Sequence, residues 1–447
     1  MIVPAAHPLK RILGLGFGIA MVFGTMVGVG ILRLPSAVAA ALGDRTLILA
    51  CWTIGGIYAL MGATAVSELA AMIPEAGGFR IYARRAFGEG CGFAIGWCDW
   101  LSNAGILAYV SMTAVAFMGA LWPAAATHDR IVALLLIATF TVLHLAGIRI
   151  ASSLTRVISV AIGLALAILV VACFVATPVG VANSLDAALP IVRSGTLVAG
   201  IVVSLRAVLL AYGGWYSPIY MAEENRDPAK TLPRAIIGGA LLVSAFYVVI
   251  NVAFVHVLSL GVLSRSELPA ADAARAVLPR GGAELVTVLS LLTVLSLLNN
   301  VMLMGPRVLF AIGRDGLFTQ QAARVSATGT PTVALLLTSA AAAVFILSGT
   351  FEQTIALCSV LFLVDFIAAF LAVFVLRRRE PNTPRPYKAF AHPASTAIVL
   401  AGSVLFLVVA AREDPRSGIL ATLFMAACVP AYAFIRRRRK PDVATAA

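Results

Sequence analysis

Charged side chains are scarce in this sequence. Only 12% of its 447 residues are Asp, Glu, Lys or Arg, whereas 61% are hydrophobic. A soluble domain carries roughly 25% charged residues, so too few charges remain to cover a water-soluble globule of this size. The mean hydropathy of +0.99 instead indicates a chain that crosses a lipid bilayer many times.

Cysteine pairs and metal-ligand spacings are also missing. The six cysteines form no C-x-x-C pair, and most fall inside or at the edge of apolar runs: Cys51, Cys91, Cys98, Cys173, Cys358 and Cys428. We interpret them as small buried hydrophobic residues rather than disulfides or metal ligands. The sequence therefore predicts no metal site and no cofactor.

Signatures of catalysis and of nucleotide use are absent. There is no G-x-x-x-x-G-K-[S/T] phosphate loop and no G-x-S-x-G elbow, and no strand precedes the glycines at 14–18. These absences argue against ATP-driven work and against an enzyme. The net charge of +13 could suggest nucleic acid, but the basic residues form short clusters between apolar runs. We expect no nucleic-acid partner.

Long apolar stretches are what the sequence has instead. A helix needs about 17–25 residues to cross the hydrocarbon core. We predict an all-α integral membrane protein, one membrane domain over 1–447 with no inserted soluble domain. It has twelve spans, near 14–34, 46–72, 92–122, 131–147, 156–177, 197–222, 234–260, 283–313, 332–349, 352–376, 395–411 and 417–435.

Lysine and arginine are unevenly distributed between the loops. With the N-terminus inside, most of the 33 basic residues fall in inside loops. This bias predicts a multi-pass protein of the inner (plasma) membrane with both termini in the cytoplasm. The basic run at 436–440 is predicted to contact the anionic membrane surface. The oligomeric state is not indicated.

Glycines interrupt two of the predicted spans. The first span contains Gly24, Gly28 and Gly30, and the sixth contains Gly213 and Gly214. A G-x-x-x-G pair alone is also typical of close helix packing. However, if each half has five spans, the second half inserts into the membrane upside down relative to the first. The breaks, in spans one and six, then fall in the first span of each half. Two such interruptions are typical of the midplane site of a secondary transporter.

Several short motifs carry a family resemblance. They are Val27-Gly28-Val29-Gly30-Ile31, similar to I-G-S-G-I-F; Glu68 with Pro74, Gly77 and Gly78; Ala211 to Trp215 followed by Glu223-Glu224 and Asp227-Pro228; Arg307 with Arg314-Asp315-Gly316 and Gly329-Thr330-Pro331; and Arg385-Pro386-Tyr387-Lys388. In this order the chain resembles the amino acid–polyamine–organocation superfamily, and is most similar in pattern to its amino acid permeases and L-type exchangers.

The resemblance implies a five-plus-five inverted repeat. Residues 14–177 and 197–376 would be the two repeats, with broken helices 1 and 6, and 395–435 would add two helices. An amino acid would bind between the breaks and cross by alternating access. Physical chemistry agrees, because free N–H groups at a half-helix start favour a carboxylate and carbonyls at a half-helix end favour an ammonium group.

Carried onto this sequence, the resemblance assigns the substrate-binding residues Thr25, Met26, Gly28, Val29, Gly30, Leu210, Ala211, Tyr212, Gly213 and Trp215. Val29 replaces a serine common in the family. Leu210 replaces a common aromatic gate, so gating either differs or falls to Trp215. The apolar side chains of Met26, Val29 and Leu210 favour a neutral amino acid. Another small amine or a polyamine is an alternative substrate, and a channel is a weaker alternative.

Polar residues inside the spans are the candidates for gating or coupling. Arg206 either attracts the substrate carboxylate or pairs with another polar group. Asp365 either carries a proton or is a structural partner of an asparagine or of Arg206. Asn103 is a candidate site residue, whereas Asp99 is expected at the cytoplasmic end, in contact with water.

The coupling ion is not evident from the sequence. The fifth span has no lysine near Ile162 or Gly163, where some family members carry one, and Gly305 and Pro306 replace eighth-helix hydroxyls of sodium-coupled relatives. We therefore expect exchange or an unassigned proton route. Asn299 and Asn300 are predicted to hold helices together, and His144 to be a packing residue.

Overall fold

All regular structure in the described part of the chain is helical. The computed structural model describes residues 8–175, 196–278, 280–348 and 351–438. These residues contain no strand, only a single bridge between Leu13 and Asn225. The predicted all-α class is confirmed.

The helices follow one another along the chain, many with only one to four residues between them. The α-helices are α1 (Leu15–Met26), α2 (Val29–Leu42), α3 (Arg45–Met72), α4 (Phe79–Phe87), α5 (Glu89–Leu121), α6 (Pro123–Thr127), α7 (Asp129–Leu145), α8 (Ile148–Val175), α9 (Leu197–Ala211), α10 (Pro228–Val257), α11 (Leu260–Arg265), α12 (Pro269–Val277), α13 (Gly282–Arg314), α14 (Thr332–Ser348), α15 (Phe351–Arg379), α16 (Ala394–Glu413) and α17 (Pro415–Arg438). Two 3₁₀ helices, η1 (Ser217–Glu224) and η2 (Gln320–Ala323), complete the set.

Many of these helices are long and apolar enough to cross a membrane. Among the described residues, eight pass by length and composition, and the bent pair α1–α2 makes a ninth. The helices α9 and α14 are shorter apolar helices. Each predicted span coincides with a helix or an interrupted helix, apart from ends that fall outside the described residues at 176–177 and 349. The twelve-span arrangement itself stays a prediction.

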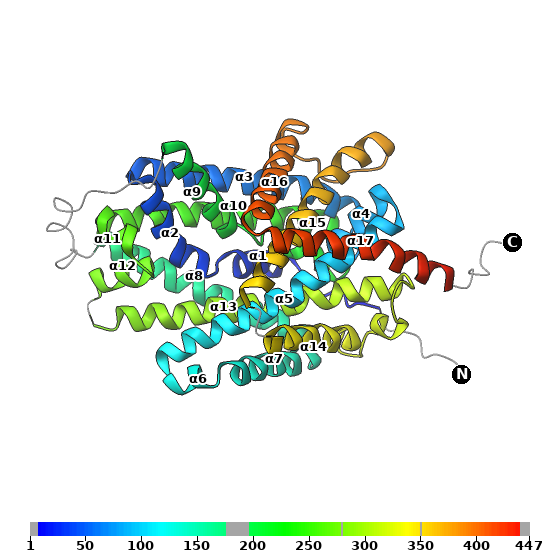
Figure 1. The fold of residues 1–447 in the computed structure, drawn as a ribbon, viewed down its shortest axis with the longest axis horizontal. Coiled ribbons are helices and arrows are strands. Elements are labelled where there is room, and N and C mark those ends of the chain that lie inside the picture. The colour runs from blue at the N-terminus through cyan, green and yellow to red at the C-terminus, as the bar shows by residue number, and fades with distance from the viewer. Residues whose placement is uncertain (1–7, 176–195, 279, 349–350, 439–447) are drawn as a thin grey trace.

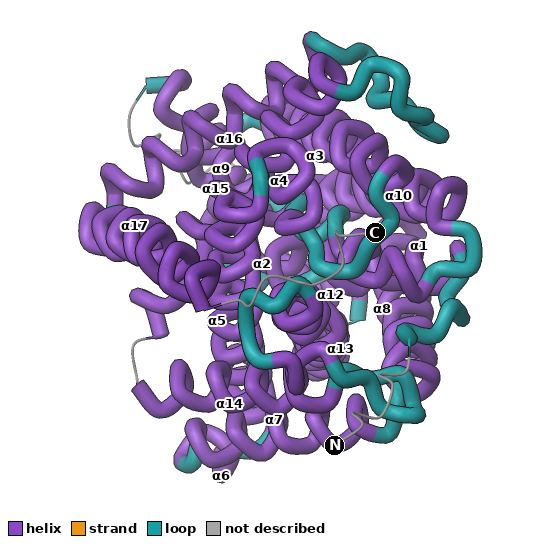
Figure 2. Tube along the Cα trace, turned by 90° about the vertical axis from the view of Figure 1, so that its right-hand side faces the viewer, coloured by secondary structure: helices purple, strands orange, loops and turns teal. Residues whose placement is uncertain are grey.

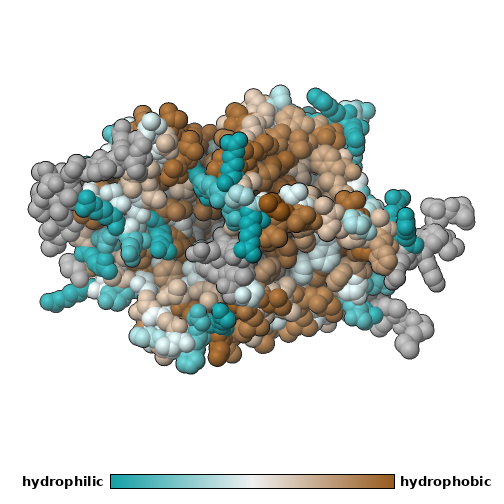
Figure 3. All heavy atoms as spheres, viewed as in Figure 1, coloured by the Kyte–Doolittle hydropathy of each residue, from teal (hydrophilic) through white to brown (hydrophobic). Residues whose placement is uncertain are grey.

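The outer helix faces are suited to lipid. On α8 an apolar stripe is 58% to 67% exposed, and it consists of Val157, Val160, Leu164, Ile168 and Val171. Their spacing of three or four residues places them on one face of the helix. Figure 3 shows hydrophobic residues over large parts of the visible face.

The long helices α3 and α13 run along the long axis of the molecule (Figure 1). α17 ends on the side where the chain enters α1, and α6 lies at the opposite end. Figure 2, which looks onto the end where α17 finishes, shows loops crossing that end between the helices.

The helix α4 lies at this end and is packed into the protein. Its residues Phe79, Arg80 and Tyr82 are almost completely buried. It contacts α5 and α15.

Candidate substrate site

The first predicted break is present in the structure. α1 ends at Met26, α2 begins at Val29, and the two helices are bent by 44°. Gly28 precedes α2 in an extended conformation (φ −120°, ψ −165°) and provides no side-chain cap. The first N–H groups of an α-helix have no acceptor within the helix, so the start of α2 offers amide donors to an anion.

The second predicted break is also present. α9 ends at Ala211, and turns over 212–216 lead into η1. Tyr212 and Trp215 in this segment are buried. Gly214 has a φ of +115°, a conformation that L side chains rarely adopt. The chain therefore leaves helical geometry here at a position that requires glycine.

The two breaks touch each other. A Cβ placed on Gly214 would lie 2.9 Å from the carbonyl carbon and oxygen of Thr25. A Cβ on Gly30 would lie 3.3 Å from Cα and Cβ of Ala211. Gly30 and Ala211 therefore pack directly against each other in this conformation.

Tyr247 on α10 joins the ends of both interrupted helices, and the sequence analysis missed it. Its hydroxyl lies 2.6 Å from the carbonyl oxygen of Met26 and 3.3 Å from that of Ala211, the last residues of α1 and α9. The single hydroxyl proton serves one acceptor at a time. Both helix ends direct negative partial charge to this point, which suits a cation. The sequence offered one clue to this residue: Tyr247 is a polar aromatic residue within the otherwise apolar span 234–260.

Buried aromatic rings support this arrangement. Trp52 packs edge-on against Tyr212 and Tyr247, with ring centroids 5.9 and 5.7 Å apart. The hydroxyl of Tyr212 donates to the carbonyl oxygen of Trp52 at 2.9 Å. The rings hold the end of α9 in place against α3 and α10.

Polar side chains of α8 and α13 anchor α1 just before its break. The Asn300 amide donates to Oγ1 of Thr25 at 3.2 Å, and the Ser159 hydroxyl donates to the carbonyl oxygen of Ala20 at 2.8 Å. Asn299 bonds His144 and Thr155. The prediction that the two asparagines hold helices together is confirmed, and His144 is a hydrogen-bonded packing residue.

A small cavity adjoins the second break. Its volume is about 60 Å³, and it is lined by Tyr58, Ala59, Gly62, Leu209, Tyr212, Gly213, Trp215, Phe366, Phe370 and Ser403. Such a space holds a few waters. None of the predicted residues of the first break lines it, so in this conformation the cavity belongs to the second break alone.

Of the predicted second-break residues, Tyr212, Gly213 and Trp215 line this cavity, whereas Leu210 and Ala211 do not. The side chain of Leu210 is 71% exposed, whereas the neighbouring Leu209 lines the cavity. Only the carbonyl group of Leu210 takes part in the break, where it accepts a bond from the Gly213 N–H at 3.2 Å. The rotation of α9 about its axis places Leu210 outward, so its side chain is not a gate in this conformation.

The candidate coupling residues have different surroundings. Arg206 forms an ion pair with Glu413 at the end of α16, and both side chains are half exposed. Its partner is therefore not Asp365. Asn103 and Asp365 are fully buried, and so is Asp99. The expectation that Asp99 contacts water is wrong, because α4 and η1 cover this part of α5.

The acidic and basic motif residues pair with one another at the end where α17 finishes. The Glu224 carboxylate receives two bonds from Arg307, at 2.8 and 3.0 Å, and both side chains are buried. Glu223 pairs with Arg314 at 2.6 Å. These contacts tie η1 to α13, so the two motifs form one interface.

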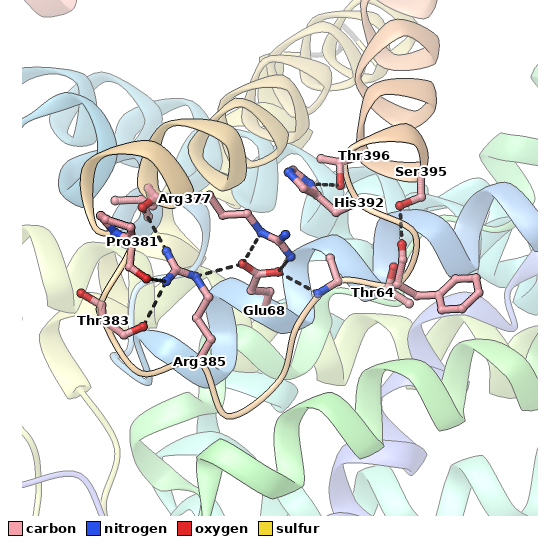
Figure 4. Close-up of polar contacts among 12 residues, drawn as sticks. Thr64, Glu68, Arg377, Pro381, Thr383, Arg385, His392, Ser395 and Thr396 are labelled. Atoms are coloured by element: carbon pink, nitrogen blue, oxygen red, sulfur yellow. Dashed lines mark hydrogen bonds and ion pairs between the residues drawn. The ribbon is translucent and has the colours of Figure 1, made fainter.

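A second interface of the same kind is shown in Figure 4. Glu68 on α3 lies between Arg377 of α15 and Arg385 of the following loop. It also accepts the Ala389 N–H at 2.7 Å. In the described part of the chain no group of three or more His, Cys, Asp or Glu could hold a metal ion.

The apolar spans and outer faces define a class: a multi-pass membrane protein, here with two of its helices interrupted. The chain belongs to the amino acid permease family, whose profile matches residues 18–435. It is a secondary transporter of amino acids, in a family of transporters rather than enzymes.

Similar proteins cover nearly the whole chain. The serine/threonine exchanger SteT of Bacillus subtilis is 26% identical over 436 residues, 96% of this chain and 98% of that protein. The b(0,+)-type amino acid transporter 1 of Mus musculus is 26% identical over 409 residues, 90% of this chain and 82% of that protein. Its Homo sapiens counterpart is 25% identical over 419 residues, 91% and 84% of the two chains.

Proposed function

We propose that this transporter binds a neutral amino acid between its two helix breaks and exchanges it across the inner (plasma) membrane by alternating access. Residues 14–177 and 197–376 form the two inverted repeats, 395–435 add two helices, and both termini are cytoplasmic. The observation that carries the proposal is the contact between the breaks, at Gly30 with Ala211 and at Gly214 with Thr25.

The two ends of the zwitterion have separate places. The carboxylate takes the amide donors at the start of α2, around Gly28, Val29 and Gly30. The ammonium group takes the carbonyl oxygens that converge on Tyr247. Thr25, Met26, Leu210, Ala211, Tyr212, Gly213 and Trp215 complete the site, Leu210 through its backbone alone.

Other substrates are less well supported. A polyamine carries several cations, but the segments 24–35 and 210–215 contain no acidic residue. A channel needs a continuous polar lining or a charged ring, which the apolar spans do not provide. Exchange is supported by one relative, which is named a serine/threonine exchanger.

Gly28 offers a clean test of the substrate site. A Cβ there would meet only the Met26 carbonyl oxygen, at 4.0 Å, so the protein itself has room for a side chain. Gly28→Val should leave the melting temperature of the purified protein nearly unchanged. It should abolish the stabilisation that the preferred amino acid gives, because the side chain occupies the carboxylate position. A thermal-shift screen of the twenty amino acids measures both effects.

Gly238→Val on α10 is the matched control, since a Cβ at Gly238 meets nothing within 4 Å. It should respond to the amino acid as the parent protein does. An undiminished thermal shift in Gly28→Val would show that the substrate lies elsewhere. Failure of the parent protein to perform counterflow in proteoliposomes with any amino acid would overturn the proposed function.

A further inference from the structure

Two buried carboxyl groups lie outside the helix breaks and influence each other. Asp99 on α5 and Asp365 on α15 are both 0% exposed; Asp365 lies within range of the charge of Asp99, and Tyr216 lies within range of both. We call them the carboxyl pair. Burying even one carboxylate is costly unless it is paired with a cation or hydrogen-bonded.

Hydrogen bonds satisfy only part of the pair. One oxygen of Asp99 accepts bonds from the Tyr220 hydroxyl at 2.7 Å and from the Asn103 amide at 2.8 Å. The other oxygen of Asp99 and both oxygens of Asp365 have no partner. Asp99 is therefore stabilised by hydrogen bonds from the protein, whereas Asp365 is not.

No cation balances the pair within the described residues. Its ionisable neighbours are Tyr216 and Tyr220 around η1 and Cys98 on α5, with Cys428 of α17 next to Cys98. Arg80 of α4 passes close to α5 at Gly96, but its guanidinium group pairs with Asp315 at 2.5 Å. Gly305 of α13 packs against both Asn103 and Thr338 of α14, and neither Gly305 nor Thr338 carries a charge.

Burial and mutual repulsion govern the protonation of the pair. Ionising both carboxyl groups is unfavourable where neither has a cation partner among the described residues and Asp365 has no hydrogen bond, so the pair favours holding at least one proton. The hydrogen bonds on Asp99 stabilise its ionised form, and Asp365 lacks any such bond. Of the two carboxyl groups, Asp365 is therefore the better place for a proton.

The carboxyl pair is connected to the substrate site through aromatic rings. Phe366, next to Asp365, stacks on Trp215 with centroids 5.7 Å apart and lines the cavity at the second break. Tyr220, which bonds Asp99, belongs to η1, the continuation of the same break. Movement of the segment after α9 therefore reaches both carboxyl groups.

A tight turn closes the pair off from water. A Cβ on Gly78, which has a φ of +64°, would overlap the ring of Tyr220 and lie 2.7 Å from Asp99 Oδ2. The backbone at the start of α4 thus covers Asp99. Separation of η1 from α4 and α5 would remove the Tyr220 bond and admit water to the pair.

We propose that the carboxyl pair is the proton-binding site that couples amino acid movement to a proton gradient. This inference rests on the proposed function. In the closed form Asp365 holds the proton. When η1 moves and water enters, the O–H bond of Asp365 breaks, the proton passes to water as hydronium and the carboxylate remains. Uptake of a proton from water on the opposite side of the membrane restores the neutral acid.

A sodium ion fits this place less well than a proton. Tyr220 and Asn103 both donate hydrogen bonds to the same oxygen of Asp99, so that oxygen is already occupied by donors rather than available to a metal ion. Aromatic rings of Phe79, Tyr216, Phe362 and Phe366 pack together around Tyr220 and the neighbours of Asp365. Beyond the carboxyl oxygens themselves, a metal cation would need further oxygen ligands, and of these four rings only Tyr216 carries one.

Proton-driven uptake by the full-length protein in proteoliposomes tests the inference. The probe is a radiolabelled mixture of L-serine, L-threonine, L-alanine and L-leucine. An acidic exterior should increase accumulation several-fold over equal pH, and a sodium gradient should have no effect. Asp365→Asn mimics the neutral acid and should lose the increase while counterflow at equal pH persists. Asp99→Asn should also lose it.

Asp129→Asn is the matched control, because Asp129 is an exposed aspartate at the start of α7. It should keep the full proton-driven increase. Infrared difference spectra give a readout independent of transport: the stretch of a protonated carboxyl group should respond to a pH jump in the parent protein and be lost in Asp365→Asn.

Three outcomes would overturn the inference: counterflow that ignores the pH gradient in the parent protein, dependence on sodium, or a full pH response in both Asp365→Asn and Asp99→Asn. Absence of counterflow in the parent protein would instead refute the proposed function. Retention of the amino acid-induced thermal shift shows that each variant is folded.

Discussion

Gly214 is the single residue whose backbone conformation most directly shapes the second break. Its φ is +115°, and a Cβ placed on it would lie 2.9 Å from the Thr25 backbone, so there is no room for a side chain. Alanine would meet both a disfavoured conformation and fixed backbone atoms. Positive φ alone costs an L residue about 1–2 kcal/mol, and the collision with Thr25 adds to that cost.

We therefore expect Gly214→Ala to lower the melting temperature and to abolish counterflow, because Thr25 and the first break would be displaced. Gly238→Ala, at a position with free space around it, should change neither. Normal exchange by Gly214→Ala would mean that the close contact between the breaks is not needed for transport.

At the scale of elements, buried ion pairs join η1 to the end of α13. Arg307 and Glu224 are 2% and 0% exposed and form two hydrogen bonds. Removing one member of a buried pair leaves an uncompensated charge and costs about 3–5 kcal/mol. We expect Glu224→Gln to destabilise the protein by an amount in this range.

A double-mutant cycle measures the coupling. Glu224→Gln with Arg307→Met should recover much of the lost melting temperature, since no isolated charge remains. Lys230→Gln removes an exposed partner of Asp227 and should cost less than about 1 kcal/mol. Additive effects of Glu224→Gln and Arg307→Met would argue against direct pairing.

The contact between α4 and the end of α13 should make stability depend on pH. Burial alone would raise the pKa of Asp315, but the neighbouring Arg80 and Arg84 outweigh it and lower the pKa. A carboxyl group whose pKa is lower in the folded state stabilises the protein above its unfolded pKa. This contribution is lost as the pH falls from about 4 toward the folded pKa.

We expect the melting temperature in detergent to decline below about pH 4, and Asp315→Asn to flatten this decline while lowering stability at neutral pH. The exposed variant Asp129→Asn should keep the acid decline of the parent. An unchanged acid decline in Asp315→Asn would assign the effect to other carboxyl groups.

At the scale of the whole molecule, the membrane topology can be tested because different helices lie at the two ends of the molecule. α6 lies at one end of the molecule, and α17 finishes at the other (Figure 1). Native cysteines give little background, because five are buried and Cys91 is only partly exposed. New cysteines at exposed positions can therefore report the side of the membrane.

Ala126→Cys on α6 should react with a membrane-impermeant maleimide added to intact cells. Gln321→Cys on η2 should react only after the membrane is opened. Labelling of Gln321→Cys from outside would reverse the proposed orientation.

The sequence by itself determined the helical class and the positions of both breaks. Hydrophobicity over a span and a glycine that weakens a helix are local properties, so the breaks at Gly28 and at Gly213-Gly214 could be predicted from the chain alone. The family motifs likewise identified Glu224 and Arg307, although their mutual pairing became visible only in the structure.

Only the tertiary structure decided which way side chains face. Spans that are apolar on every side carry no periodic signal for the rotation of a helix about its axis. For this reason the outward direction of Leu210, the partner of Arg206, the burial of Asp99 and the contacts of Tyr247 with both helix ends could not be derived. Each depends on a helix distant in the sequence, and such contacts form only when the spans pack together.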